Sequence, residues 1–293
     1  MKFNGKVAVA VICSTLLVGL GGYAYGQEKQ ESAPEAQKSA AQVEEATPVT
    51  GVATMGVFSK YVFRGYELSK NSVVFQPGLT ATLGGFSAGF WGNIDSSQHR
   101  TQSFGENDHH KSFNETDITL SYTKAFGKLS LTGGYIYYGT KYADETEEVF
   151  GTVAYDMIGK PTLSIYRDIN KYVGTYINFS LAHSIPLVRD VTLDLGASAG
   201  YMIGDSDYWK TFETETGDYT GSKYSAFHDG KLQAGLTIPV TRKVSVVPVL
   251  QYWFPLSGEA KRHWGYGRDA VSYNPNGYLK SFFAGGVNVN YSF

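Results

Sequence analysis

Hydrophobic and polar residues alternate along most of the chain from Val52 onward. In residues 191–201, Val, Leu, Ala and Tyr occupy the odd positions, while Thr, Asp, Gly and Ser occupy the even ones. Residues 117–123 and 73–83 follow the same rule. A period of two places alternate side chains on opposite faces of a β-strand, whereas an amphipathic helix needs apolar residues at i, i+3 and i+4. The pattern therefore predicts strands with one apolar and one polar face.

Twelve segments of this kind can be counted, and the connections between them alternate in length. The segments are 52–64, 73–83, 86–94, 115–126, 129–139, 146–155, 161–169, 174–185, 191–203, 226–240, 244–254 and 278–293. Connections after the even-numbered segments are short, as at Gly84-Gly85 and Gly127-Lys128. Long polar connections follow only odd-numbered segments, at 95–114, 204–225 and 255–277.

Two all-β architectures fit such segments. A soluble β-sandwich hides its apolar faces between two sheets, and its loops need not sort by parity. An outer-membrane barrel has an even strand number, short turns at one end, long loops at the other and aromatic girdles at both interfaces. Aromatic residues do lie near the segment ends, at Tyr61, Phe63, Tyr122, Phe126, Tyr155, Tyr201, Tyr252 and Phe254. We therefore predict a closed antiparallel transmembrane β-barrel of about 12 strands.

The first fifty residues differ from the rest. Residues 1–26 combine Lys2 and Lys6, an apolar run over 7–20 and a small-residue end, which predicts a cleaved secretory signal peptide. Residues 27–50 are acidic and contain no aromatic residue, which predicts a flexible periplasmic tether. Residues 51–293 would form the barrel. The only cysteine, Cys13, lies in the signal segment, so disulfides and a thiolate metal site are not expected.

Composition excludes several classes of protein. No apolar run approaches the roughly 18 residues of a membrane-spanning helix. The formal net charge of −2 argues against a nucleic-acid binder. The high contents of Gly (34 residues) and Tyr (22 residues) suit inward small positions and interfacial rings.

The polar parity predicts which charged residues face the lumen. These are Lys60, Arg64, Glu115, Asp117, Glu148, Asp168, Asp194, Lys231 and Lys280. Four cations against five anions give no basis for choosing anion or cation selectivity, which rings of one charge sign would indicate. Arg64, before Gly65 at the outer end of the first segment, is the strongest candidate for a gate or a solute contact. The alternative is an ion pair that ties this strand to a neighbour.

Other candidate chemistry is weaker. Asp108-His109-His110 with His99 could hold a metal, but the spacing matches no structural site, and a solvated loop is the simpler interpretation. Trp209 and Phe212, in the acidic segment 205–218, could form an external patch or fold into the barrel mouth. A hydrolase would need a Ser/His pair, yet His183 and Ser184 are adjacent and would point to opposite faces of a strand. We expect no enzyme and no cofactor.

Several blocks resemble the TorF family of porin-type proteins. They are residues 59–65 (SKYVFRG), 76–79 (QPGL) and 85–93 (GFSAGFWGN), with weaker similarity at 115–118 and 134–138. The final strand, ending in Phe293, resembles the closing strand that the barrel-assembly machinery of Gram-negative bacteria reads. The resemblance implies a barrel among outer-membrane lipids that passes small hydrophilic solutes or ions. The alternative is a structural or adhesin-type barrel with a plugged lumen and external loops that bind a partner.

Overall fold

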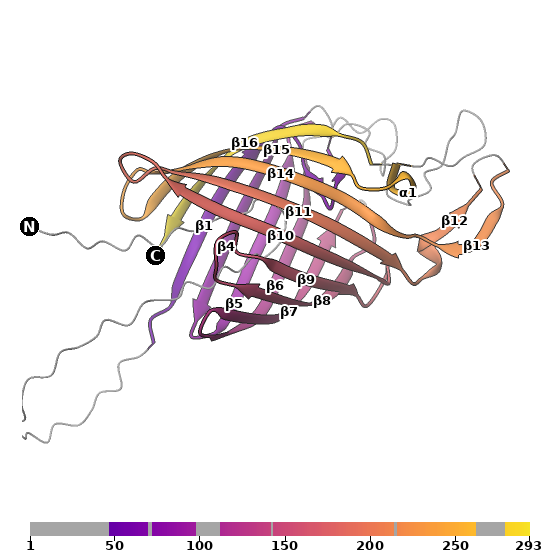
Figure 1. The fold of residues 1–293 in the computed structure, drawn as a ribbon, viewed down its shortest axis with the longest axis horizontal. Helices are drawn as coiled ribbons and strands as arrows, with labels where there is room; N and C mark the ends of the chain where they lie inside the picture. The colour runs from indigo at the N-terminus through magenta and orange to yellow at the C-terminus, as the bar shows by residue number, and fades with distance from the viewer. Residues whose placement is uncertain (1–46, 70–71, 98–111, 142, 214–215, 262–278) are drawn as a thin grey trace, which may run out of the picture.

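The computed structural model describes residues 47–69, 72–97, 112–141, 143–213, 216–261 and 279–293. Twelve antiparallel strands form one closed barrel, which confirms the predicted fold class (Figure 1). The strands are β1 (Thr50–Phe58), β4 (Val74–Leu83), β5 (Phe86–Asp95), β6 (Ser112–Phe126), β7 (Leu129–Thr140), β8 (Thr146–Tyr155), β9 (Thr162–Asp168), β10 (Gly174–Pro186), β11 (Thr192–Gly204), β14 (Ser225–Pro239), β15 (Val244–Pro255) and β16 (Phe282–Ser292). No helix in these ranges is long and apolar enough to cross a membrane.

The remaining elements are short. Strands β2 (Val62–Phe63) and β3 (Tyr66–Glu67) pair with each other, as do β12 (Lys210–Phe212) and β13 (Tyr219–Lys223). A 3-10 turn, η1 (Asp207–Trp209), precedes β12, and a single helical turn, α1 (Gly258–Lys261), follows β15.

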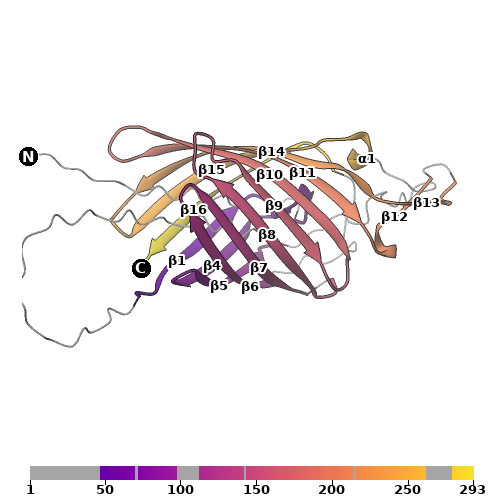
Figure 2. The same ribbon diagram turned by 60° about the horizontal axis from the view of Figure 1, so that its bottom comes forward.

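The barrel closes where its first and last strands meet. Strand β1 pairs with β16 from Val52↔Ser292 to Phe58↔Gly286, and Gly51 and Phe293 exchange two backbone hydrogen bonds of 3.0 Å. Every other barrel strand pairs with its neighbour in the chain, so the sheet has no free edge. Figure 2 shows β6–β11 running side by side around the wall.

The two ends of the barrel differ as predicted. The connections β4–β5, β6–β7, β8–β9, β10–β11 and β14–β15 are short, and the end of β16 lies at the same end (Figure 1). We call this the turn end, and the opposite one the loop end. Strand β1 begins at Thr50, next to the predicted barrel boundary. The predicted signal peptide, most of the tether and the His-bearing segment lie outside the described residues.

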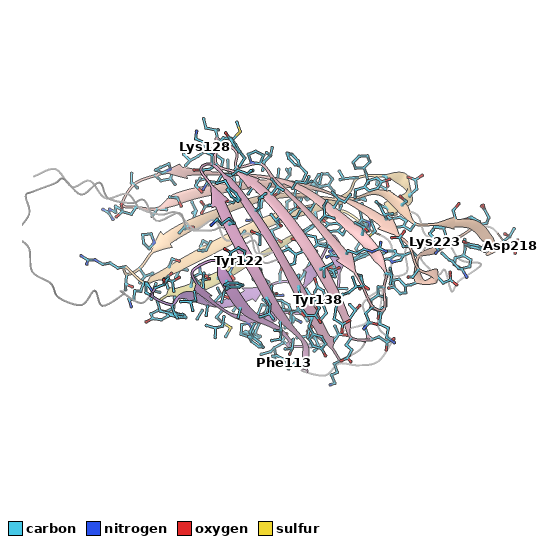
Figure 3. All side chains as sticks on the ribbon, turned by 90° about the horizontal axis from the view of Figure 1, so that it is seen from below. Phe113, Tyr122, Lys128, Tyr138, Asp218 and Lys223 are labelled. Carbon is cyan, nitrogen blue, oxygen red and sulfur yellow. The ribbon has the colours of Figure 1, made fainter. Side chains whose placement is uncertain are left out.

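The outer wall is apolar on all sides. Each of the twelve barrel strands has at least one large apolar side chain exposed on it, such as Leu79, Leu120, Leu232 or Val287. Figure 3 shows the side chains that project from the wall, with Phe113, Tyr122 and Lys128 following β6 to its turn. The inner positions hold mainly Ser, Thr, Gly and charged or aromatic residues. The alternation therefore places the apolar face outside, the reverse of a soluble protein.

Aromatic rings gather near both ends of this outer wall. At the turn end, Phe86 packs on Tyr122 with ring centroids 4.6 Å apart, and Tyr291 stacks on Phe293. At the loop end, Tyr252 contacts Phe283 (4.8 Å). Further outward rings, all among those predicted, are Phe126, Tyr155, Tyr201 and Phe254. The prediction is wrong for Tyr61 and Phe63, which lie inside the barrel.

Candidate functional site: the lumen and its inner hairpin

The first predicted strand, 52–64, is wrong beyond Phe58, because the chain leaves the wall there and turns into the lumen. Residues 59–69, which we call the inner hairpin, contain β2 and β3. The amides of Leu68 and Ser69 both bind the carbonyl of Tyr61, at 2.9 and 3.2 Å, and Ser69 Oγ accepts the amide of Tyr61. The hairpin consists of short strands, so its hydrophobic and polar residues continue the alternation of β1. The sequence pattern therefore does not reveal the bend after Phe58.

The inner hairpin is packed on several sides. Tyr61 lies against Trp91 of β5, with centroids 5.5 Å apart, and Val62 packs with Trp253 of β15. Tyr66 packs its ring on His228 of β14. Seven hairpin residues are at least nine-tenths buried: Tyr61, Val62, Arg64, Gly65, Tyr66, Glu67 and Ser69. The hairpin therefore occupies the interior at the loop end of the barrel.

Arg64 lies at the tip of the inner hairpin. Arg64 and Gly65 form its turn with φ values of 47° and 79°, a left-handed conformation that Gly adopts at no cost. A Cβ atom on Gly65 would lie 2.7 Å from Cβ of Asp229, so the tip also approaches the wall too closely for a larger residue.

The Arg64 guanidinium forms a bidentate ion pair with Glu148 of β8. Its Nη1 and Nη2 donate to Oε1 and Oε2 at 2.8 and 2.7 Å, and Tyr138 Oη donates to the same carboxylate at 2.9 Å. The guanidinium carbon lies 4.5 Å from the ring centroid of Tyr176 and 5.2 Å from that of Tyr166. Of the two predicted roles, the ion pair is the one observed. It does not join neighbours, however: β1 and β8 are five strands apart around the barrel, so the pair spans the lumen.

A second charged group holds the base of the inner hairpin. Glu67 forms an ion pair with Lys60 within the hairpin and another with Lys280, whose Nζ lies 3.6 Å away, just before β16. The polar parity of the sequence predicts Lys60 and Lys280 at inner positions, whereas Glu67 falls in a predicted connection. No pattern in the sequence marked Glu67 as inward, because the bend after Phe58 was not detected.

Glu115 and Asp117 lie on the inner face of β6, close to the inner hairpin. Asp117 is only 3% exposed, and neither of its carboxylate oxygens has a hydrogen-bond partner among the described residues. The neighbouring strands place Trp91 and Tyr138 beside it, and Tyr61 of the hairpin approaches both carboxylates. No ion pair is found for either carboxylate within the part of the chain that the structure describes.

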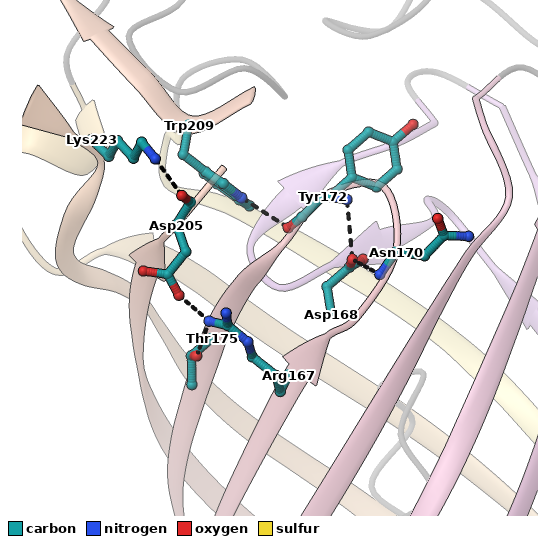
Figure 4. Close-up of polar contacts among 8 residues, drawn as sticks. All are labelled: Arg167, Asp168, Asn170, Tyr172, Thr175, Asp205, Trp209 and Lys223. Atoms are coloured by element: carbon teal, nitrogen blue, oxygen red, sulfur yellow. Dashed lines mark hydrogen bonds and ion pairs between the residues drawn. The ribbon is translucent and has the colours of Figure 1, made fainter. Parts of the chain in front are cut away.

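The other two predicted anions have structural partners. Asp168 accepts the Thr146 hydroxyl at 2.7 Å and the amides of Asn170 and Tyr172 at 3.0 Å, which closes the β9–β10 loop (Figure 4). Asp194 accepts hydroxyls from Ser184 and Thr237, both at 2.6 Å. Both carboxylates are thus saturated by local hydrogen bonds.

Lys231 and its neighbours show where the alternation of β14 is interrupted. Strands β11 and β14 shift register between Ala199 and Tyr201, so that His228 and Asp229 are both buried. Tyr176 Oη donates to Asp229 at 2.9 Å, and Lys231 Nζ lies 5.4 Å from the ring centroid of Trp253. Strict alternation from the inward Lys231 places Asp229 inside but His228 outside, so sequence reasoning missed the burial of His228. A β-bulge adds one residue to a strand and brings it to the other face.

The lumen at the turn end is lined by small hydroxyl side chains. Cross-strand pairs of hydroxyls lie 2.8–2.9 Å apart: Thr82 with Ser87, Thr123 with Thr132, and Thr152 with Ser164. Most of the charged residues of the lumen lie toward the loop end, around the inner hairpin, whereas Asp194 lies near the β10–β11 turn. The interior therefore changes from a half lined mainly by hydroxyl groups to a crowded half that holds most of the charges.

At the outer rim, Trp209 is buried rather than part of the exposed patch predicted for it. Its Nε1 donates to the carbonyl of Tyr172 at 2.9 Å, and its ring stacks on Tyr224 (Figure 4). Asp205 lies beside it, where its carboxylate pairs with Arg167 and its carbonyl accepts Lys223 Nζ (Figure 4).

Beyond Trp209, strands β12 and β13 extend away from the barrel as an external hairpin (Figure 1). Phe212 and Tyr219 face each other across it, with ring centroids 5.9 Å apart. At its base, a hydrogen bond from Lys210 holds the pKa of the exposed Asp207 below its usual value. The hairpin β12–β13 thus projects outward, while Trp209 at its base packs in the buried cluster that contains Tyr176 and Tyr224.

Residues 42–241 match one protein family, described as a bacterial protein of unknown function (Gcw_chp). The chain belongs to this family. The match covers more than half of the sequence and includes the inner hairpin and the first ten strands of the barrel, from β1 to β14. The family description assigns no role, and the TorF resemblance stays a prediction.

Among solved structures, the chain is similar to the KdgM porin and the NanC porin. Sequence identities are 11% and 10%, with 83% and 82% of this chain and 99% and 98% of those chains covered, at TM-scores of 0.46 and 0.47. An outer-membrane channel from Pseudomonas putida F1 is 11% identical, with 88% of this chain and 100% of that chain covered, at a TM-score of 0.40. No curated protein matches the sequence. At these scores, the likenesses carry no argument about what passes through this barrel.

Proposed function

We propose that this protein is an outer-membrane channel of a Gram-negative bacterium that passes small hydrophilic solutes or ions passively. The observation that carries this proposal is the inverted barrel, with large apolar side chains exposed on every strand and polar side chains within. Monomeric soluble proteins rarely expose a contiguous apolar patch beyond a few hundred Å². A closed barrel also satisfies all its strand hydrogen bonds internally, which a lipid environment requires.

The orientation follows from the two ends. Outer-membrane barrels have short periplasmic turns and longer external loops, so the turn end would face the periplasm. The external hairpin and Trp209 would then lie outside the cell. The terminal strand β16, ending beside Phe293, would be the segment that the barrel-assembly machinery reads, and cleavage of residues 1–26 would precede insertion.

The interior supports passage of hydrophilic solutes more than catalysis. Hydroxyl-bearing side chains line most of the turn-end half, where Asp194 also lies, and the other predicted lumen residues lie toward the loop end. His183 is exposed on the outer face of β10, while Ser184 faces inward and donates to Asp194. These two residues therefore cannot form a nucleophile–base pair. We propose no enzymatic role and no cofactor.

A second candidate is a structural or adhesin-type barrel with a plugged lumen and partner-binding external loops. The burial of the inner hairpin favours it, because eleven residues occupy the lumen of a barrel that lies between the filled eight-stranded and the open sixteen-stranded type. The external hairpin β12–β13 would supply the binding surface.

Single-channel recording separates the two candidates. The barrel is refolded, its folded fraction is checked by circular dichroism, and currents are recorded for the native sequence and for a variant in which residues 60–68 are replaced by a short Gly/Ser linker. A channel gives discrete steps that grow when the hairpin is removed. If the folded native barrel gives no steps and only the variant conducts, the plugged barrel is the correct description. If neither conducts, passive transport is refuted.

Surface labelling of intact cells tests the orientation. Cysteines introduced in the external hairpin, near Asp218, should react with an impermeant maleimide. Cysteines at Lys128 and Arg242, in turns of the opposite end, should not. The reverse pattern would contradict the orientation.

A further inference from the structure

The charges around the inner hairpin are unevenly compensated. Arg64 is fully engaged by Glu148, and Lys60 and Lys280 share Glu67. Lys231 interacts with the Trp253 ring and with the nearby Asp229. These contacts involve all four of the cations that the sequence analysis placed in the lumen. Two carboxylates, Glu115 and Asp117, are left without a counter-ion among the described residues.

Geometry places these two carboxylates together. They are two residues apart on one face of β6, so their Cβ atoms are about 7 Å apart. Glu148 lies two strands away on β8, but its charge is paired with Arg64. A carboxylate that is 97% buried with no partner carries a large desolvation cost, and such groups are normally paired or bind a cation.

The surroundings favour a monovalent cation over a divalent metal ion. Trp91, Tyr138 and Tyr61 border the carboxylates, and aromatic faces attract cations. Within the described ranges, no group of three or more His, Cys, Asp or Glu residues could hold a metal ion. An alkali ion or a protonated primary amine fits a site with two carboxylates and aromatic walls, while a divalent ion would lack ligands.

We propose that Glu115 and Asp117 form a binding site for monovalent cations at the loop end of the lumen, and that this site makes the channel prefer cations to anions. The selectivity part rests on the proposed channel function, while binding itself does not. The site lies beside the inner hairpin, so a cation that enters from the loop end would meet it before the hydroxyl-lined half.

The reversal potential in a KCl gradient tests selectivity. The native barrel should be more permeable to K⁺ than to Cl⁻. Removing a unit charge about 6 Å from the ion path should lower the permeability ratio about threefold in Asp117→Asn. Glu115→Gln should act in the same direction. Glu147→Gln is the matched control. Glu147 precedes Glu148 on β8 and faces outward, so the change removes a unit charge outside the lumen and should leave the permeability ratio unchanged.

Thermal stability of the folded barrel tests binding without any current. At constant ionic strength, replacing the bulky cation N-methylglucamine with K⁺ or with methylammonium should raise the Tm of the native barrel, since a ligand that binds only the folded state stabilises it. The rise should disappear in Asp117→Asn and persist in Glu147→Gln. A rise with methylammonium alone would identify an amine site, and a rise with K⁺ alone an alkali-ion site.

The outcomes separate the two claims. A folded barrel that carries no current refutes the channel, yet a Tm rise that depends on Asp117 still supports the cation site. A conducting barrel whose ratio and Tm are unchanged by Asp117→Asn overturns the site, as does an anion-selective native barrel.

Discussion

Replacing Arg64 with Gln should release the inner hairpin from the wall. The change removes both guanidinium hydrogen bonds to Glu148, whose side chain is only 5% exposed, and leaves that carboxylate without its counter-ion. Breaking a buried ion pair by removing one partner costs about 3–5 kcal/mol. Two hydrogen bonds to charged groups, at about 1.5–3 kcal/mol each, give a similar sum.

This cost should appear as local opening rather than as unfolding of the barrel, because the twelve-stranded wall does not depend on Arg64. A loss of about 3 kcal/mol raises the open population of the hairpin by at least about 100-fold. Val62→Cys provides the probe, since Val62 is buried against Trp253 and Ala284. Cys13 is the only native cysteine and lies in the predicted signal peptide, so the introduced thiol is labelled alone.

The assay compares maleimide labelling rates of Val62→Cys with and without Arg64→Gln in the refolded barrel. The double change Arg64→Gln with Glu148→Gln is the control: it removes both charges and should recover most of the protection, because no buried charge is then left unpaired. If Arg64→Gln leaves the labelling rate unchanged, the ion pair with Glu148 does not hold the inner hairpin against the wall.

Three further changes test other parts of the structure. Leu120→Arg, midway along the outer face of β6, should cost about 2–4 kcal/mol of folding free energy in lipid vesicles, measured by urea titration, while Leu120→Val should cost much less. Asp194→Ala leaves the hydroxyls of Ser184 and Thr237 without their acceptor, so the same titration should show a loss of about 1–3 kcal/mol. Trp209→Ala removes a buried ring at the rim and should cost about 3–5 kcal/mol of local stability. Faster protease cleavage of the external hairpin would report that last loss, and unchanged cleavage would contradict the anchoring role.

The wall of the barrel could be predicted from the sequence because each residue there obeys one local rule. Inward and outward positions alternate without exception over β10 and the facing part of β11, and the predicted ends of most strands are within two residues of those observed. Long loops at alternate connections then fixed which end of the barrel carries them. Both signals are local in sequence, so a single chain reveals them.

The contents of the lumen could not be predicted in this way. Nothing before Ser59 signals a bend, and the alternation through Val62 is that of a different, inner strand. The burial of His228 depends on a bulge whose position is set by pairing with β11. The partner of Arg64 is 84 residues away and becomes a neighbour only once the barrel has closed. These features depend on tertiary contacts that no local pattern contains.

The pairing of β1 with β16 closes the barrel and also helps to position the inner hairpin. Ser59, the first residue of the inner hairpin, binds Gly285 of β16 twice: its amide donates to the Gly285 carbonyl at 2.9 Å, and its Oγ accepts the Gly285 amide at 3.1 Å. Val62 then packs on Ala284 of the same strand. The last strand to be synthesised, β16, therefore completes the barrel wall. It also supplies contacts to the inner hairpin, which is synthesised much earlier. During assembly, the contacts of the inner hairpin with β16 cannot form until this C-terminal strand has joined the sheet.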